Sequence, residues 1–309
     1  MKLLALVLVA TSMTVALAQP QLDFLNHGRP VLDAHNCYPY EGQWADRIDR
    51  ALKLGFPVGI EQDIAWAKGR PVVTHTAKTT GDEPTLRDHF FERVRPIIEQ
   101  ALKDNDRAKW PIIILHFDFK SLEPETLRGV WQVLGEYQSW ITTAPQTSDP
   151  HKLSKFDKKP LLVLTEDADI QEEIFFKQLK PGERLRVFGS ASTGKIDAKT
   201  REERVHLMAT LPPEALLPQP PTNFRRWWNN SWFEVEEGGQ TRQAIGRRLT
   251  TRGCEHWSAA RTSWATGSGF TPWTVLKSLK TADGSAATTS ARARRPSYAG
   301  ERRSTPAWT

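Results

Sequence analysis

Short runs of apolar, β-branched residues alternate along the chain with longer segments in which apolar residues recur every three or four positions. The short runs predict strands at residues 31–35, 58–64, 71–75, 112–119, 161–164 and 185–188. The longer segments predict amphipathic helices at residues 44–54, 86–104 (with a kink at Pro96), 124–136 and 170–179. This alternation is typical of a parallel sheet whose polar strand ends meet at one mouth, so we expect an α/β fold of the TIM-barrel type.

Acidic residues and histidines gather at several of these strand ends. Glu61 and Asp63 are two positions apart in one strand and therefore share a face, and Asp118 lies at the end of a later strand. His35 and His75 end two further strands. Carboxylates from separate segments suit a hard cation such as Mg²⁺ or Ca²⁺, and imidazoles exchange protons near neutral pH. The pattern predicts a divalent-metal site flanked by an acid and base pair.

The order of these residues resembles the PLC-like phosphodiesterases, which include glycerophosphodiester phosphodiesterases and phosphatidylinositol-specific phospholipase C relatives. A His is followed 26 residues later by Glu-x-Asp, and a second His lies 12 residues beyond that pair. The resemblance is most specific over residues 31–121 and implies a TIM-type barrel. It also implies the following roles: His35 and His75 as catalytic residues, Glu61, Asp63 and Asp118 as metal ligands, and Asn36 and Lys120 as substrate-binding residues.

The activity that the resemblance implies is metal-dependent hydrolysis of a glycerophosphodiester- or phosphoinositide-like substrate. A hydroxyl of the substrate alcohol would attack its own phosphorus while one His removes a proton and the other protonates the leaving group. Water would later open the cyclic phosphate. The sequence departs from the commonest glycerophosphodiesterase pattern at Asn36-Cys37, where Arg-Gly is usual, and at His75-Thr76, where His-Asp is usual. The substrate alcohol therefore stays open.

An aromatic and cationic segment at residues 223–232 has two interpretations. It can form the sixth strand and its loop, which would place Arg225 beside a phosphate or a sugar-like headgroup as a further substrate-binding residue. It can equally be ordinary barrel wall with solvated Arg side chains. Both interpretations give the segment a place in the sheet.

The beginning of the chain has the pattern of a signal peptide over residues 1–18. Lys2 precedes an apolar stretch at residues 3–15, and Ala16-Leu17-Ala18 forms a small-x-small cleavage site. The apolar stretch is short for a bilayer, and no later segment approaches 18 apolar residues. We expect a secreted or periplasmic protein without a transmembrane segment. The two cysteines do not form a disulfide framework.

The end of the chain differs in composition from residues 19–242, which suit a single barrel. Residues 251–309 contain nine Lys and Arg against three Asp and Glu, and this surplus equals the net charge of the whole chain, +6. Apolar periodicity is lost there. We interpret residues 243–309 as a basic, disordered low-complexity tail that arises from a frameshift near Arg242, which leaves the last two barrel strands missing. The alternative is a genuine basic tail that contacts nucleic acid or anionic lipid. If the tail arises from a frameshift, its positive charge is no evidence for a nucleic-acid partner. The expected partner is a small phosphodiester or phospholipid headgroup.

Two other classes of function compete with this hypothesis. A secreted binding module, or an inactive truncated pseudoenzyme, would keep the barrel mouth without turnover. A glycoside hydrolase barrel would use paired carboxylates such as Glu166 and Glu61. The second alternative explains neither His35 nor His75.

Overall fold

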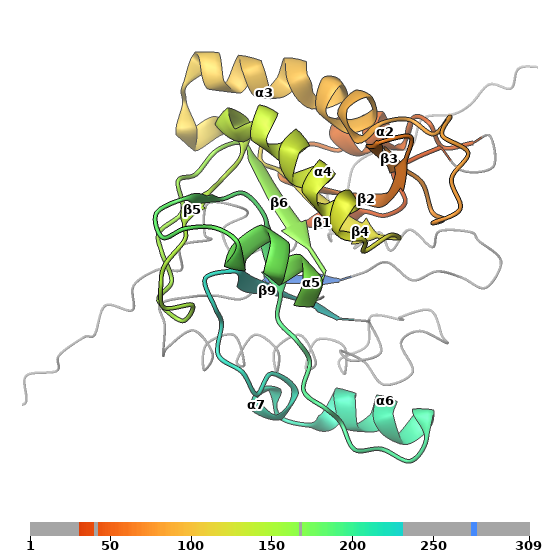
Figure 1. The fold of residues 1–309 in the computed structure, drawn as a ribbon, viewed down its shortest axis with the longest axis vertical. Helices are drawn as coiled ribbons and strands as arrows, with labels where there is room; N and C mark the ends of the chain where they lie inside the picture. The colour runs from red at the N-terminus through yellow and green to blue at the C-terminus, as the bar shows by residue number, and fades with distance from the viewer. Residues whose placement is uncertain (1–30, 40–42, 167–168, 231–272, 277–309) are drawn as a thin grey trace, which may run out of the picture. The chain divides into compact units, whose positions relative to one another are not determined.

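A curled parallel β-sheet forms the frame of the protein (Figure 1). The computed structural model describes residues 31–39, 43–166, 169–230 and 273–276. The predicted signal peptide and most of the predicted tail lie outside these residues. Among the helices of the described residues, none is both long and apolar enough to cross a membrane.

The strands follow one another across the sheet in the order β1-β2-β4-β6-β8-β9-β10, every neighbouring pair is parallel, and β3 pairs antiparallel with β2. The strands from β1 to β9 in this order curl into a half-barrel (Figure 1). A separate small sheet pairs β5 with β7. The strands are β1 (Leu32–Ala34), β2 (Val58–Ala67), β3 (Arg70–Val73), β4 (Ile113–Phe119), β5 (Ala144–Pro145), β6 (Leu161–Thr165), β7 (Arg184–Leu185), β8 (Phe188–Ser190), β9 (Arg225–Asn230) and β10 (Trp273–Leu276).

Helices follow most of the parallel strands, and α2 and α4 pack against β2. The α-helices are α2 (Arg47–Lys53), α3 (Glu92–Asp104), α4 (Pro124–Glu136), α5 (Asp169–Glu172), α6 (Arg201–Thr210) and α7 (Pro213–Leu216). Wider π-helical turns lead into α3 at Arg87–Phe91 and extend α5 at Glu173–Lys177. The strand–helix alternation expected from the hydrophobic pattern is thus confirmed for the described residues.

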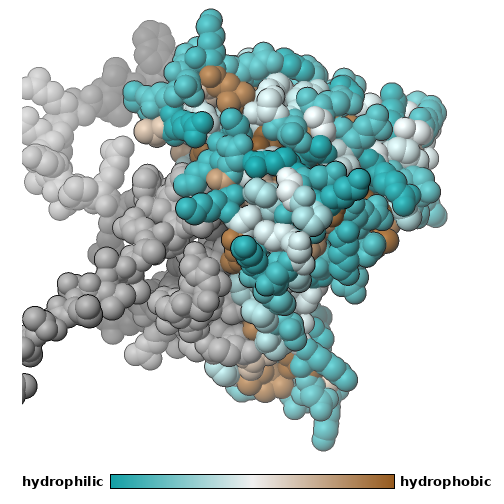
Figure 2. Space-filling view, turned by 60° about the vertical axis from the view of Figure 1, so that its left-hand side comes forward, coloured by the Kyte–Doolittle hydropathy of each residue, from teal (hydrophilic) through white to brown (hydrophobic). Residues whose placement is uncertain are grey.

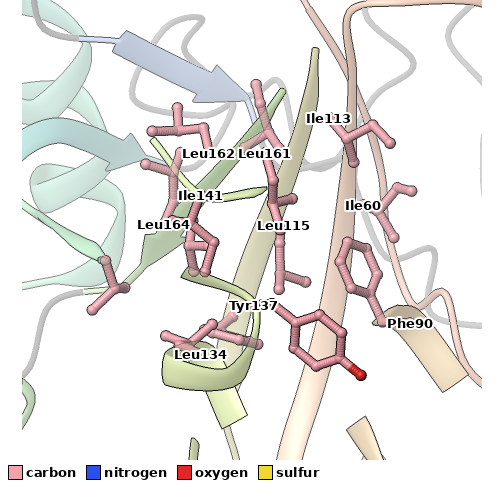
Figure 3. Packing of buried hydrophobic residues seen from close by; sticks show 14 of the residues in the cluster. Ile60, Phe90, Ile113, Leu115, Leu134, Tyr137, Ile141, Leu161, Leu162 and Leu164 are labelled. Atoms are coloured by element: carbon pink, nitrogen blue, oxygen red, sulfur yellow. The ribbon is translucent and has the colours of Figure 1, made fainter. Parts of the chain in front are cut away.

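Apolar side chains from the central strands and from the helices form one continuous core (Figure 3). Ile113 and Leu115 of β4 and Leu161 of β6 have no exposed surface. Phe90 and Leu134 come from the helical side and pack into the same cluster. Burial of one such side chain stabilises the folded state by about 1.5–3 kcal/mol. The core therefore holds the strands, and the residues at their ends, in fixed register. On the face in Figure 2 the surface is mainly hydrophilic, with apolar residues in small separate areas.

Several element boundaries differ from the prediction. Helix α2 begins at Arg47 and not at residue 44, because Trp44 has a φ of 68°, which a right-handed helix does not allow. The predicted helix at 86–104 is divided into a π-helical turn and α3, which continues through Pro96. The strand predicted at 185–188 is wrong: the segment belongs to two strands, β7 and β8, that lie in different sheets.

The predicted tail contains one described strand. Strand β10 pairs in parallel with β9, with Trp273 opposite Trp227, and continues the order of the sheet. The expectation that residues 243–309 supply no strand is therefore wrong at these four residues. The local sequence Trp-Thr-Val-Leu is aromatic and β-branched, which favours a strand whatever the composition around it. The rest of this segment, with the frameshift interpretation, lies outside the described residues.

Candidate metal-binding and acid–base site

The carboxylates predicted to bind a metal lie together at the carboxyl ends of β2 and β4. The register pairs Glu61 with His116 and Asp63 with Asp118, so alternate residues of both strands share one face. Ligand atoms of Glu61, Asp63 and Asp118 all lie within 4.8 Å of one another. The Glu61 and Asp63 side chains are each 1% exposed, and Asp118 is 21% exposed. Oxygen atoms at this spacing could hold a metal ion.

The two buried carboxylates share an arrangement that fits such an ion. One oxygen of each accepts hydrogen bonds, while Glu61 Oε1 and Asp63 Oδ1 are buried and have no hydrogen-bond partner among the described residues. A buried carboxylate oxygen without a partner is strongly unfavourable, since it has lost its hydration. A cation would satisfy both oxygens, so the donor set and its orphaned atoms fit a hard divalent ion.

His35 reaches the cluster from the end of β1. Its Nε2 atom lies 3.2 Å from Glu61 Oε2, and the backbone N–H of Asn36 donates to the same oxygen at 2.7 Å. Asn36 has a φ of 55°, in the left-handed region that Asn tolerates better than most residues. The Arg47 guanidinium donates to the Asn36 carbonyl at 3.0 Å and so supports this turn. The turn brings both His35 and a backbone donor onto one carboxylate.

His75 reaches the same cluster from the segment that follows β3. Its Nδ1 atom lies 2.6 Å from Asp63 Oδ2. An ionised carboxylate can only accept, so Nδ1 carries the proton and Nε2 is the nitrogen that can exchange protons with a substrate. The neighbouring backbone is held as well, because the Thr74 N–H donates to the Asp63 carbonyl at 3.0 Å. Both predicted imidazoles therefore contact predicted metal ligands.

Lys120 places a positive charge in the cluster. Its Nζ atom lies 2.9 Å from Asp118 Oδ2 and 3.3 Å from Asp63 Oδ2. Partial burial lowers the pKa of Lys120, but the hydrogen bond to Asp118 and the charge of Asp63 outweigh it and raise the pKa. The ammonium group therefore stays charged at neutral pH. The expected role of Lys120 in substrate binding stays a prediction.

Glu61 has a pKa that its surroundings raise. Burial, and then the negative charge of Asp63, raise its pKa to about 7. His116 and the Asn36 N–H favour the ionised form and oppose part of this shift. A cation bound here would favour the ionised form further, because it would supply the charge that the buried site lacks.

Sequence reasoning missed His116, which lies on the same face of the sheet as Glu61. The His116 side chain is 1% exposed, its Nδ1 lies 3.0 Å from Asp33 Oδ2, and its Nε2 lies 3.8 Å from Glu166 Oε1. Burial lowers its pKa, but the hydrogen bond and charge of Asp33, with the charges of Glu61 and Glu166, raise it overall. The signal was in the sequence, since His116-x-Asp118 repeats the spacing of Glu61-x-Asp63 on the next strand.

Tyr38 is the second residue that the sequence analysis overlooked. Its hydroxyl lies 2.7 Å from Asp63 Oδ2, 2.7 Å from Asn36 Oδ1 and 3.0 Å from His75 Nδ1. Nothing in the hydrophobic pattern indicated it, because a Tyr beyond a strand end has no periodic signature. Its neighbour Cys37 is buried, and burial raises the pKa of the thiol, which excludes a thiolate nucleophile at neutral pH.

Arg225 is engaged elsewhere in the fold. Its Nε atom donates to Glu172 Oε2 at 2.7 Å, and one terminal nitrogen, Nη1, donates to the Ser190 carbonyl at 3.1 Å and to Ser192 Oγ at 2.8 Å. A further terminal nitrogen lies 3.2 Å from Asp169 Oδ1. These contacts tie the start of β9 to α5 and β8. They give no support to the expectation that Arg225 binds substrate.

Comparisons with known proteins identify no relative. No protein-family model, no curated protein and no solved structure matches this chain. The resemblance to the PLC-like phosphodiesterases therefore stays a prediction from the sequence, and the fold and the site rest on the geometry described above.

Proposed function

We propose that this chain is a secreted or periplasmic phosphoric diester hydrolase that depends on Mg²⁺ or Ca²⁺ and acts on a glycerophosphodiester- or phosphoinositide-like substrate. The half-barrel would then belong to a TIM-type barrel. One observation carries the proposal: two histidines from different segments, His35 and His75, each contact a different carboxylate of one cluster that could hold a cation. A purely structural acid cluster has no need of two partly exposed imidazoles at its rim.

Charge supports a cation-dependent reaction on an anionic substrate. Acidic groups at this mouth outnumber the cationic groups among them. The acids are Asp33, Glu61, Asp63, Asp118 and Glu166, and the cations are Lys120 and, when protonated, His116. A phosphodiester anion would be repelled by such a surplus of negative charge. A divalent cation removes most of that surplus and gives the phosphate oxygens an attractive partner.

The chain's own residues supply the proton transfers. When bound, the cation neutralises charge on the phosphate oxygens and acidifies the attacking hydroxyl. His75, held through Nδ1 by Asp63, exchanges its proton at Nε2, and His35 acts from the opposite carboxylate. One imidazole takes the proton as the substrate hydroxyl forms a bond to phosphorus, and the other gives a proton to the alcohol whose bond to phosphorus breaks. Lys120 adds positive charge beside the phosphate.

Hydrolysis of glycerophosphocholine and of phosphatidylinositol by the full chain tests this proposal. We expect hydrolysis in the presence of Mg²⁺ or Ca²⁺, its loss on chelation with EDTA, and its loss in His35→Ala. His151→Ala is the matched control, because His151 is an exposed residue in a turn. Activity that persists in EDTA, or equally in His35→Ala, would contradict the mechanism. Cation binding without turnover would indicate the alternative of a binding module, and cleavage of a glycoside instead would favour the glycoside hydrolase.

A further inference from the structure

Tyr38 is held in a fixed place beneath the carboxylate cluster. Its side chain is 1% exposed, and its N–H donates to the Asn36 carbonyl at 3.0 Å. The preceding Cys37 carbonyl accepts from Gln62 Nε2 at 2.7 Å and from His89 Nε2 at 2.8 Å. These bonds use both polar groups of the Cys37–Tyr38 peptide and fix its orientation. The phenol hydroxyl is therefore not a mobile group that happens to touch the site.

The Tyr38 hydroxyl has one proton and three polar neighbours. His75 donates its own Nδ1 proton to Asp63, so that nitrogen is not an acceptor. The Tyr38 proton can then go to Asn36 Oδ1 or to Asp63 Oδ2, each 2.7 Å away. An ionised carboxylate is the stronger acceptor, and burial with the charge of Asp63 raises the pKa of Tyr38, which keeps the phenol protonated. We therefore assign this hydrogen bond to Asp63.

The donors around Asp63 are distributed unevenly over its two oxygens. Oδ2 lies 2.7 Å from the Tyr38 hydroxyl, 2.6 Å from His75 Nδ1 and 3.3 Å from Lys120 Nζ. Oδ1 is buried and has no hydrogen-bond partner among the described residues. A partial rotation of the carboxylate would break these bonds, whereas a half-turn would only exchange two equivalent oxygens. The distribution therefore orients Asp63 with one specified oxygen left for a ligand.

We infer that Tyr38 is a positioning residue, whose hydroxyl holds Asp63 Oδ2 so that Oδ1 is kept for a divalent cation. The inference rests on the proposed cation site and adds a residue that acts through Asp63 and does not itself touch the cation. Outer hydrogen bonds of this kind to metal ligands change affinity by about 10-fold to 100-fold when they are removed. The prediction for Tyr38 is therefore quantitative and concerns binding, not only catalysis.

Titration calorimetry of the full chain with Mg²⁺ tests the inference directly. Tyr38→Phe keeps the ring and removes the hydroxyl, and we expect the dissociation constant for Mg²⁺ to rise about tenfold or more. Tyr137→Phe is the matched control, because Tyr137 is also a buried residue and its hydroxyl donates to a carboxylate, Glu92 Oε1, at 2.7 Å. Its Mg²⁺ affinity should stay within about twofold of the wild type. An unchanged affinity in Tyr38→Phe would overturn the inference.

A second variant tests the direction of the Tyr38 hydrogen bond. Asn36→Gly removes the competing acceptor, keeps the backbone N–H that donates to Glu61, and suits the left-handed φ of 55°. The Tyr38 proton then has only Asp63 as a partner, so Mg²⁺ affinity should be equal to that of the wild type or tighter. A clear loss of affinity would overturn the inference. If circular dichroism shows that Tyr38→Phe does not fold, a loss of Mg²⁺ affinity in Asn36→Gly still overturns the inference.

Binding and hydrolysis separate this inference from the proposed function. Mg²⁺ binding that weakens in Tyr38→Phe, in a chain that hydrolyses no phosphodiester, would support the role of Tyr38 and contradict the proposed reaction. Metal-dependent hydrolysis with a Mg²⁺ affinity that does not depend on Tyr38 would support the proposed reaction and contradict the role of Tyr38. A wild-type chain that binds neither Mg²⁺ nor Ca²⁺ would overturn both.

Discussion

Nδ1 of His75 lies 2.6 Å from Oδ2 of Asp63. Asp63 lies in β2, and His75 follows β3, which runs antiparallel beside β2. The contact gives Asp63 two tasks. It orients an imidazole that is 37% exposed, and it offers its other oxygen to the carboxylate cluster. An acid–base residue and a candidate metal ligand are thus coupled, so a substitution of one changes the other in a predictable way.

His75→Gln and Asp63→Asn should separate these two tasks. Gln cannot exchange protons, so we expect His75→Gln to lower kcat for a phosphodiester by about 10²-fold to 10⁴-fold while Mg²⁺ still binds. Asp63→Asn should lose both Mg²⁺ affinity and hydrolysis, because it removes a ligand and the anchor of the imidazole. Calorimetry and steady-state kinetics on both variants check this. Equal Mg²⁺ affinity in Asp63→Asn and in the wild type would contradict the assignment of Asp63 as a ligand.

The pKa of Glu61 predicts that cation binding releases a proton. Because burial and Asp63 raise this pKa to about 7, Glu61 is protonated at lower pH and the cation must displace that proton. We expect about one proton released per Mg²⁺ near pH 6 and very little near pH 8.5, with affinity that falls about tenfold per pH unit below 7. Calorimetry in buffers of different ionisation enthalpy measures this release. A constant release at both pH values would show that another group titrates.

Arg225 should matter for stability and not for substrate affinity. Its side chain is 12% exposed and lies 2.7 Å from the Glu172 carboxylate. Arg225→Met leaves that half-buried carboxylate without this donor, so we expect a loss of about 1–3 kcal/mol in the free energy of unfolding. KM for a phosphodiester should be unchanged at temperatures where the variant is folded. Urea unfolding and steady-state kinetics check both, and a raised KM without loss of stability would restore the substrate-binding hypothesis.

The strands and helices of the described sheet were predictable where the local hydrophobic pattern alone determines the secondary structure. Strands β4 and β6 begin with apolar runs rich in Ile, Leu and Val, and β2 has apolar residues on both sides of Glu61-Gln62-Asp63. Helix α4 runs from Pro124 to Glu136, the bounds that the sequence pattern predicts. The carboxylate cluster that could hold a metal ion was predictable for the same reason, because Glu61 and Asp63 share a face of one strand. The boundaries at Trp44 and at residues 185–188 were not predictable, since a positive φ and a change of sheet depend on tertiary contacts.

The missed residues show the limit of the same reasoning. His116 and Asp118 repeat the spacing of Glu61 and Asp63, but this signal is weak inside an apolar strand. Only the register places His116 beside Glu61 and against Asp33. The contacts of Tyr38 and Arg225 depend on how their side chains pack in three dimensions. Spacing along the chain does not specify this packing. Arg225 was assigned to substrate from its chemistry alone, and its actual partners come from α5 and β8.

His89 should make the protein less stable as the pH falls. Burial lowers the pKa of His89 below its ordinary value of 6.5, although its hydrogen bond to the Cys37 carbonyl partly opposes this. A group with a lowered pKa in the folded state contributes stability above the unfolded value, and that stability is lost as pH falls through 6.5 toward the folded pKa. In His89→Gln the side chain still donates but does not titrate, so the difference in unfolding free energy between about pH 7.5 and pH 5 should shrink. Urea unfolding of the metal-free chain measures it, with the exposed His151→Gln as control. Parallel pH profiles for the wild type and His89→Gln would show that another buried group is responsible, and the Cys37 turn beneath the site would then not be the acid-sensitive element.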